Sequence, residues 1–257
     1  MWACPVRRPV TSRKCGHRVR HTVPVTDPLA DLSRLEGVPS AMGAAMAGVD
    51  AVLRDRGLRK VEPQAVADAA WLSARAAVEV SGPYGEQESA DVAAATVRML
   101  AEVPQQAELL GRAPGQVMAR LHSVWGRGLV DDAELGRVRE DAGVAERLTA
   151  LQQLLTTPTT APALVVAGVL HAELWTLAPF STGSWAVALG CEQAVLVRTG
   201  VDPYGVIPLA AGHAEVGGHR EALERYGSGT AAGMRAWLVH MAAAVGAAAE
   251  LAPIAGR

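Results

Sequence analysis

The residues with the clearest chemical potential lie in a short polar turn between two apolar segments, in the stretch LAPFSTGSWAVAL at positions 177–189. Pro179 disfavours helical backbone at Ala178, so the preceding helix should end there. Gly183 permits the backbone conformation that a tight turn requires, and the Ser184 side chain can cap the helix that follows. The free N–H groups at the start of that helix carry partial positive charge. The turn therefore predicts a weak binding site for an anion.

Histidine, cysteine and acidic residues elsewhere offer weaker candidates. His171 lies seven residues before Ala178 on the same face of the predicted helix. It could serve there as a substitute base, although a hydrogen-bonded core position is the favoured interpretation. His213, Glu215 and His219 form His-x-Glu-x-x-x-His, which lacks the spacing of a metalloprotease helix. The N-terminal segment also holds cysteines and histidines that match no strong metal-binding pattern, at Cys4, Cys15, His17 and His21. We therefore expect no metal site.

The distribution of charge excludes several classes of protein. Residues 1–21 carry six basic and no acidic side chains, whereas the rest of the chain carries 18 basic against 26 acidic ones. A net acidic body is unsuited to nucleic acid, because phosphate contacts need a basic face. The basic segment lacks the continuous apolar stretch of a secretion signal, and the apolar run 161–170 is too short to span a bilayer. We expect residues 1–22 to be disordered and the protein to bind neither nucleic acid nor membrane.

Composition indicates the cellular setting. Cysteine occurs at three widely spaced positions, an odd number that suits a reducing compartment rather than a disulfide-stabilised fold. Alanine, glycine, valine and arginine dominate, which is typical of a GC-rich bacterial genome. We therefore expect a cytoplasmic bacterial protein, in which Cys191 is a small residue of the apolar core.

Hydrophobic periodicity predicts an all-α fold. Apolar residues recur at three- and four-residue spacing over nine segments, at 41–56, 63–80, 87–103, 114–125, 144–157, 161–177, 184–199, 213–225 and 229–249. Glycine and proline separate the segments, at positions such as Pro104 and Gly200. A short hairpin is possible only over 126–139. We expect one globular unit with an N-terminal helical layer over 23–112 and a core over 113–250.

The order of these segments resembles the Fic (Fido-domain) family, whose signature His-Pro-Phe-x-Asp/Glu-Gly-Asn-Gly-Arg-x-x-Arg lies between two helices. Pro179, Phe180 and Gly183 match the turn of that signature. Other stretches resemble the family's flap segment, the helices around the signature and the closing helices, at 121–139, 171–180, 190–203 and 219–242. The resemblance covers roughly 115–247. It implies a Fic-type helical bundle, which in the family transfers AMP from ATP to protein hydroxyls with the help of Mg²⁺.

The reactive residues of the signature are replaced. The family's general base, its metal-binding acid, its Asn, its second Gly and its two phosphate-binding Arg correspond here to Ala178, Thr182, Ser184, Trp185, Ala186 and Leu189. A positioned general base contributes about 10²–10⁴ to the rate, so we expect no catalytic residue at this turn. Trp185 is expected to fill space that phosphates would take. Residues 73–82 resemble the setting of the family's inhibitory helix, but Ala77 and Ser81 replace its Ser/Thr and Glu, and an ordinary core helix is the favoured interpretation.

Together these features predict a non-catalytic Fic-fold protein that binds a protein partner or, with low affinity, a nucleotide. Contacts to ATP with Mg²⁺ would come from the turn and the flap, at Phe180, Ser181, Thr182, Gly183, Ser184 and Arg137. Two alternatives stay open. One is a transferase with rewired chemistry that uses His171 or the flap arginines, and the other is a helical module that forms a homo-oligomer.

Overall fold

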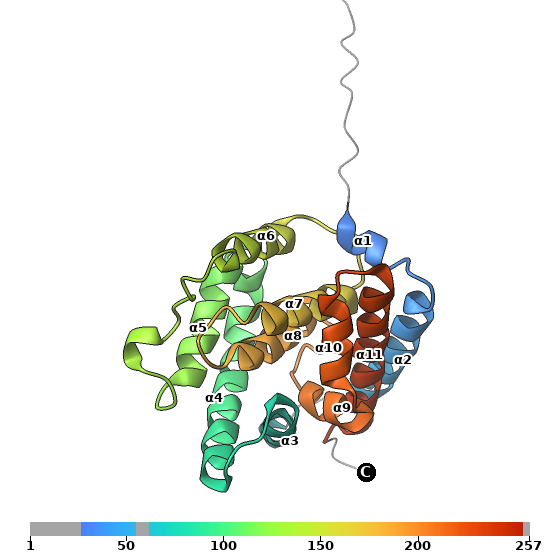
Figure 1. Ribbon diagram of the computed structural model, residues 1–257. Helices are drawn as coiled ribbons and strands as arrows, with labels where there is room; N and C mark the ends of the chain where they lie inside the picture. Colours follow the sequence, from blue (N-terminus) through green and yellow to red (C-terminus); the bar gives the residue numbers. More distant parts are fainter. Residues whose placement is uncertain (1–26, 55–61, 254–257) are drawn as a thin grey trace, which may run out of the picture.

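The computed structural model describes residues 27–54 and 62–253 and is built from helices joined by loops (Figure 1). The helices are α1 (Pro28–Leu32), α2 (Val38–Arg54), α3 (Pro63–Ser81), α4 (Glu86–Leu110), α5 (Pro114–Gly126), α6 (Val144–Thr156), α7 (Ala163–Leu177), α8 (Ser184–Thr199), α9 (Leu209–Val216), α10 (His219–Gly227) and α11 (Ala231–Glu250). No β-strand occurs within the two described ranges, which confirms the all-α class. Across the same residues, no helix combines the length and the apolar character that crossing a membrane requires. The basic segment 1–22, with its cysteines and histidines, lies outside the described residues.

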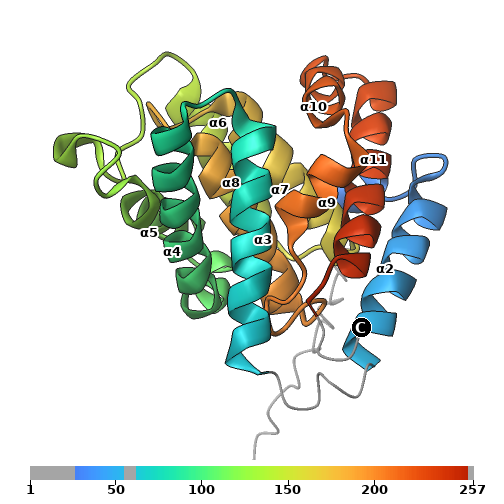
Figure 2. The ribbon, with the colours of Figure 1, turned by 90° about the horizontal axis from the view of Figure 1, so that it is seen from below.

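Helices α7 and α8 form the centre of the molecule. Eleven of the 15 residues of α7 and 12 of the 16 residues of α8 are buried, as expected for helices that are apolar around most of their circumference. Helices α4 and α5 pack on α8, α10 and α11 pack on α7, and α2 lies against α11 (Figures 1 and 2). Helix α3 contacts both α4 and α9. Helices from both sides of the proposed boundary at residues 112 and 113 therefore share one hydrophobic core.

Pro104 does not end its helix. Helix α4 continues beyond it to Leu110, and the buried residues Val103, Ala107 and Leu110 keep helical spacing across the proline. Packing therefore outweighs the hydrogen bond that proline cannot donate, and the predicted helix end at this position is wrong. The carbonyl deprived of that bond belongs to Leu100, and both Leu100 and Pro104 line a cavity described below.

A pair of glycines divides the segment that was predicted as one helix over 213–225. Gly217 and Gly218 both have positive φ, at 67° and 68°, and separate α9 from α10. Glycine adopts such angles without steric cost. In one continuous helix His213 and His219 would project to different sides, whereas after the break their ring centroids lie 4.8 Å apart. The prediction of a single helix is wrong. The break between α9 and α10 brings His213 and His219 together.

The segment between α5 and α6, which we call the flap loop (127–143), is not the hairpin considered possible there. Its residues form an isolated β-bridge between Arg127 and Val130 and a short 3₁₀ turn at Asp132–Glu134, without paired strands. Arg98 of α4 donates to three carbonyls at the end of α5, at 2.9–3.1 Å. These bonds satisfy acceptors that the helix end leaves free and fix the point where the flap loop begins.

Candidate functional site

The predicted turn joins α7 to α8 and lies against the flap loop. Helix α7 ends at Leu177, and Ala178 adopts a left-handed conformation (φ 46°) that no other non-glycine residue shares in the described part of the chain. The Arg139 side chain donates to the carbonyls of Ala178 at 2.7 Å and Leu177 at 3.2 Å, and its backbone N–H donates to that of Pro179 at 2.8 Å. A cation at the negative end of the helix dipole is stabilising. The turn and the flap loop therefore form one structural unit, as the resemblance implies.

The indole of Trp125 lies directly against Gly183. Gly183 (φ 77°) is the N-cap of α8, and a Cβ at this position would be 2.1 Å from Cζ3 of Trp125. The indole is buried, and its Nε1 donates to the hydroxyl of Thr96 at 3.2 Å. Trp185 meets the Trp125 ring edge-on, with 5.5 Å between the ring centroids. Trp125 therefore fills the space next to Gly183, and Trp185 lies beside it. Trp185 had been expected to fill space at this turn.

Ser184 does not cap α8, contrary to prediction. Its buried hydroxyl accepts a hydrogen bond from the Phe180 N–H at 2.9 Å and donates to the Phe180 carbonyl at 3.2 Å. The side chain therefore closes the turn instead of binding the free N–H groups of the helix. Phe180 is buried in the core, as expected of the residue that anchors the turn. Ser181 and Thr182 are exposed, and the Ser181 hydroxyl donates to the carboxylate of Glu134 in the flap loop at 2.7 Å.

His122 of α5 forms hydrogen bonds with both the turn and the flap loop. Its Nδ1 accepts a hydrogen bond from the N–H of Gly136 at 2.8 Å, so the proton lies on Nε2, which donates to the carbonyl of Thr182 at 2.9 Å. The imidazole also stacks on the ring of Phe180, with 4.1 Å between the centroids. Burial lowers the pKa of His122 below its ordinary value. The hydrogen bond from the Gly136 N–H therefore depends on the neutral ring, because a protonated Nδ1 has no lone pair to accept it.

The protein is expected to lose stability as the pH falls below about 6.5, the pKa of an exposed histidine. The pKa of His122 is lowered in the folded state, so between the two pKa values the unfolded chain binds more protons and acid favours unfolding. One such histidine lowers the free energy of unfolding by up to about 1.4 kcal/mol for each pH unit. Urea denaturation at pH 7.5, 6.5 and 5.5 measures the slope. His122→Gln should have a shallower slope than the wild type, and an equal slope would contradict this role of His122.

His171 is not part of the turn. It belongs to a group of five polar side chains, one from each of the helices α7 to α11, which we call the histidine cluster: His171, Glu192, His213, His219 and His240. The first four are buried and His240 is half-buried. This placement agrees with the favoured interpretation of His171 as a hydrogen-bonded core residue. It also removes the geometric basis for His171 as a substitute base at the turn.

Glu192 lies at the centre of the histidine cluster. Its carboxylate oxygens are 2.5 Å from Nδ1 of His171 and 3.3 Å from Nε2 of His213. Beyond these rings, Nε2 of His171 lies 3.0 Å from Nε2 of His219, and Nδ1 of His213 lies 3.1 Å from Nε2 of His240. Neutral imidazoles satisfy all four contacts when every N–H in them points toward Glu192. Nδ1 of His219 is then left without a hydrogen-bond partner.

Burial controls protonation in the histidine cluster. It lowers the pKa of His171 and of His219, and lowers that of His240 to about 4. Burial alone would raise the pKa of Glu192, but the imidazoles of His213 and His171 outweigh it and lower this pKa to about 2. At neutral pH the carboxylate of Glu192 is therefore ionised, and the rings of His171, His219 and His240 are neutral.

No motif in the sequence predicted the histidine cluster. His213 and His219 were expected on one helix together with Glu215, which belongs to none of the contacts above. The available signal was the Gly217–Gly218 pair, because a Gly-Gly dipeptide marks a turn. Treating that pair as a break places the two histidines on separate helices that can face each other.

Comparison with known proteins supports the fold but gives no evidence for an activity. No model of a protein family matches the chain, and no curated protein matches it. Among solved structures, a Fic family protein from Desulfovibrio desulfuricans G20 is similar, with a TM-score of 0.62 over 88% of this chain and 74% of that chain. The chain has a Fic-like fold. Its sequence identity to that protein is 15%, so the likeness extends to architecture and not to activity.

The residues of this Fic-like fold do not suit ATP with Mg²⁺ at the turn. Thr182 offers no carboxylate to a metal ion. Ala186 and Leu189, which the sequence resemblance aligns with two arginines of the signature, are buried. Leu189 packs with four alanines of α3 and α9, at Ala76, Ala77, Ala210 and Ala211. Arg137, the predicted contact from the flap loop, is exposed on the surface. The indole of Trp125 against Gly183 further limits the space at the turn.

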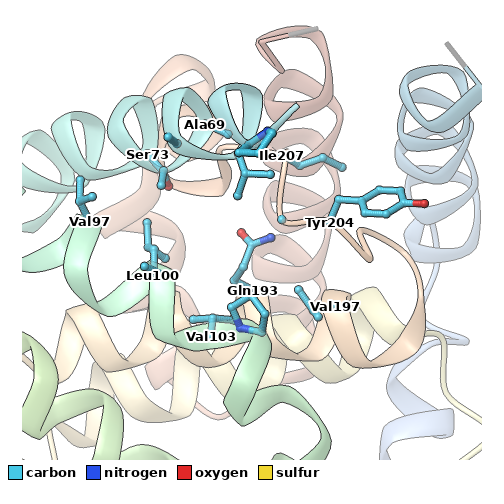
Figure 3. A pocket seen from close by; sticks show the side chains of 16 residues that line it. Ala69, Ser73, Val97, Leu100, Val103, Gln193, Val197, Tyr204 and Ile207 are labelled. Carbon is cyan, nitrogen blue, oxygen red and sulfur yellow. The ribbon is translucent and has the colours of Figure 1, made fainter. Parts of the chain in front are cut away.

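A separate cavity of about 290 Å³ opens between α3, α4, α8 and the loop after α8 (Figure 3). Its walls are mostly aliphatic, and no charged side chain is among the described residues that line it. The polar groups on its wall include Ser73 and Gln193, and Tyr204 lies at one side of it with about half of its surface exposed. Such a lining suits an apolar group rather than a phosphate.

Proposed function

We propose that this protein with a Fic-like fold does not transfer AMP and acts by binding a protein partner. The observation that supports the first half is the indole of Trp125 against Gly183, within the turn that resembles the family's nucleotide-binding signature. Loss of a general base alone costs about 10²–10⁴ in rate, and loss of one electrostatic stabiliser costs about 10²–10³. These factors do not simply multiply, because residues of one site act as a unit, but either one reduces transfer severely.

Incubation with labelled ATP, Mg²⁺ and a cell lysate should therefore leave label transfer at background. Calorimetric titration with ATP should show no saturable heat. A Fic protein with an intact signature serves as the positive control for both measurements. Label transfer that survives Ala178→Asp but disappears in His171→Ala would contradict the proposal and support the transferase with rewired chemistry.

The apolar cavity supports a binding role for the second half of the proposal. Its uncharged lining and the half-exposed Tyr204 beside it suit an apolar side chain presented by a partner. Ala67 of α3 is exposed and lines the cavity, whereas Gln64 is exposed on the same helix and does not. The two positions allow the same charge to be placed inside and outside the proposed contact.

The test compares capture of partners by three forms of the protein. Ala67→Glu should lose a partner that the wild type captures, and Gln64→Glu should retain it. If the partner is a second copy of this chain, light scattering on the purified protein should show a homo-oligomer. Equal capture by all three forms would place the contact elsewhere, and a stable homo-oligomer with no other partner would support the helical module instead.

A further inference from the structure

The histidine cluster brings imidazoles from α7, α9 and α10 to one point. The ring centroids of His171, His213 and His219 are 4.8–5.2 Å from one another. One nitrogen of each ring lies within 4.8 Å of those of the other two, and the Nε2 atoms of His171 and His219 are 3.0 Å apart. Zinc–nitrogen bonds of about 2.0–2.1 Å in a tetrahedron separate the nitrogens by roughly 3.4 Å. The rings are therefore close to the spacing of imidazoles that share one metal ion.

The carboxylate of Glu192 lies behind these rings in the position of a second coordination shell. It contacts Nδ1 of His171 and Nε2 of His213, at 2.5 and 3.3 Å. The other nitrogen of each ring faces a second imidazole, Nε2 of His219 for His171 and Nε2 of His240 for His213, and a metal ion can take the place of that hydrogen bond. Metal-binding histidines commonly donate their second N–H to a carboxylate, which fixes the tautomer and raises the basicity of the ligand nitrogen.

Hydrogen bonds alone leave the histidine cluster incomplete in two respects. Nδ1 of His219 is buried and has no partner, although the large majority of buried polar side-chain atoms are paired. This nitrogen can bind a metal ion, whereas Nε2 of the same ring contacts His171. The buried carboxylate of Glu192 has only imidazoles as its hydrogen-bond partners among the described residues. A buried charge is costly unless an opposite charge or a metal ion compensates it. A divalent cation in contact with the rings would supply that charge.

We propose that the histidine cluster binds one divalent transition-metal ion of the zinc type, through His171, His213 and His219, with Glu192 orienting the rings. Imidazole is a preferred ligand of Zn²⁺. His240 is half-buried and 3.1 Å from His213, and so marks the side from which an ion enters. Because the three ligands are buried and come from α7, α9 and α10, the ion joins these helices and stabilises the fold.

Cobalt titration tests the site directly, because Co²⁺ replaces Zn²⁺ and absorbs visible light. The full-length protein is treated with a chelator, dialysed and titrated with Co²⁺. We expect visible bands that saturate at one equivalent and disappear when Zn²⁺ is added, together with a higher melting temperature in Zn²⁺. Thiolate ligands would add an intense near-ultraviolet band. Its absence would exclude binding by Cys4 and Cys15 of the N-terminal segment.

Three variants locate the bound ion. Glu192→Gln should weaken Co²⁺ binding by about 10–100-fold as a change in the second shell, and His219→Gln should weaken it further. His122→Gln, which changes a buried histidine outside the cluster, should bind as the wild type does. If His219→Gln does not fold, which far-ultraviolet circular dichroism shows, the wild type and Glu192→Gln still decide the question.

Three results would overturn the proposal. The first is a folded, chelated wild type with no visible cobalt bands and no change of melting temperature in Zn²⁺, which would leave a cluster held by hydrogen bonds alone. The second is a thiolate band in the cobalt spectrum. The third is undiminished Co²⁺ binding in Glu192→Gln and His219→Gln.

Discussion

Replacing Gly183 by alanine is expected to lower the free energy of unfolding by about 2–5 kcal/mol. The left-handed backbone at this residue (φ 77°) costs an alanine about 1–2 kcal/mol. The new methyl group would also lie 2.1 Å from Cζ3 of Trp125, an indole that is buried and hydrogen-bonded to Thr96. Overpacking of this kind adds about 1–3 kcal/mol. Urea denaturation measures the loss.

Gly200 provides the matched control, because it ends the same helix that Gly183 begins. Its φ is 75°, and a Cβ there would meet no atom within 4 Å. Gly200→Ala should therefore cost only the backbone contribution of about 1–2 kcal/mol. In a double-mutant cycle, Gly183→Ala should cost less in a Trp125→Leu background than in the wild type. Equal losses for the two glycines would show that the indole does not occupy the space above the turn.

The second large effect is expected at Glu192, measured with the chelated protein. Glu192→Leu leaves the buried N–H groups of His171 and His213 without an acceptor. A buried donor left without an acceptor costs about 1–3 kcal/mol, so the two N–H groups together should cost about 2–6 kcal/mol. Thermal and urea denaturation in the presence of a chelator measure this loss without any contribution from bound metal.

Glu192→Gln is the informative control, because glutamine has nearly the same shape as glutamate and keeps one oxygen that accepts hydrogen bonds. The amide oxygen can accept from His171, and the amide NH₂ can donate to Nε2 of His213 once that ring moves its proton to Nδ1. The relocated proton then faces Nε2 of His240, which is half-buried and can place its own proton on the other nitrogen. We expect a loss of about 1 kcal/mol, in the range of one ordinary hydrogen bond. A loss equal to that of Glu192→Leu would mean that the tautomers cannot exchange.

Local chemistry was enough to predict the turn and most helices. Pro179 and Gly183 determine the turn through their own backbone preferences, and α8 begins and ends at the predicted residues. Pro104 was misjudged because its local effect is opposed by packing of Val103 and Ala107, which only the folded chain reveals. The Fic-like architecture followed from the order of segments, and the solved structure of a Fic family protein agrees with it.

The side-chain contacts at the turn and in the histidine cluster could not be predicted in the same way. Trp125 reaches Gly183 from a helix far away in sequence, and nothing in either local pattern records that contact. The histidine cluster takes one residue from each of five helices, so its spacing follows helix and loop lengths rather than any motif. Periodicity places each member on an inward face, but only the relative rotation of the helices decides which faces meet.

Because the histidine cluster takes one residue from each of the helices α7 to α11, it can form only after α11 has been synthesised. Helices α7 and α8 leave the ribosome before α10 and α11, which cover α7, so the apolar pair is synthesised before its own shielding. Chains interrupted before His240 would present those apolar segments to solvent or to one another, and such exposed surface makes a nascent chain prone to aggregation. Completion of α11 is thus the step that covers the apolar centre of a newly made molecule.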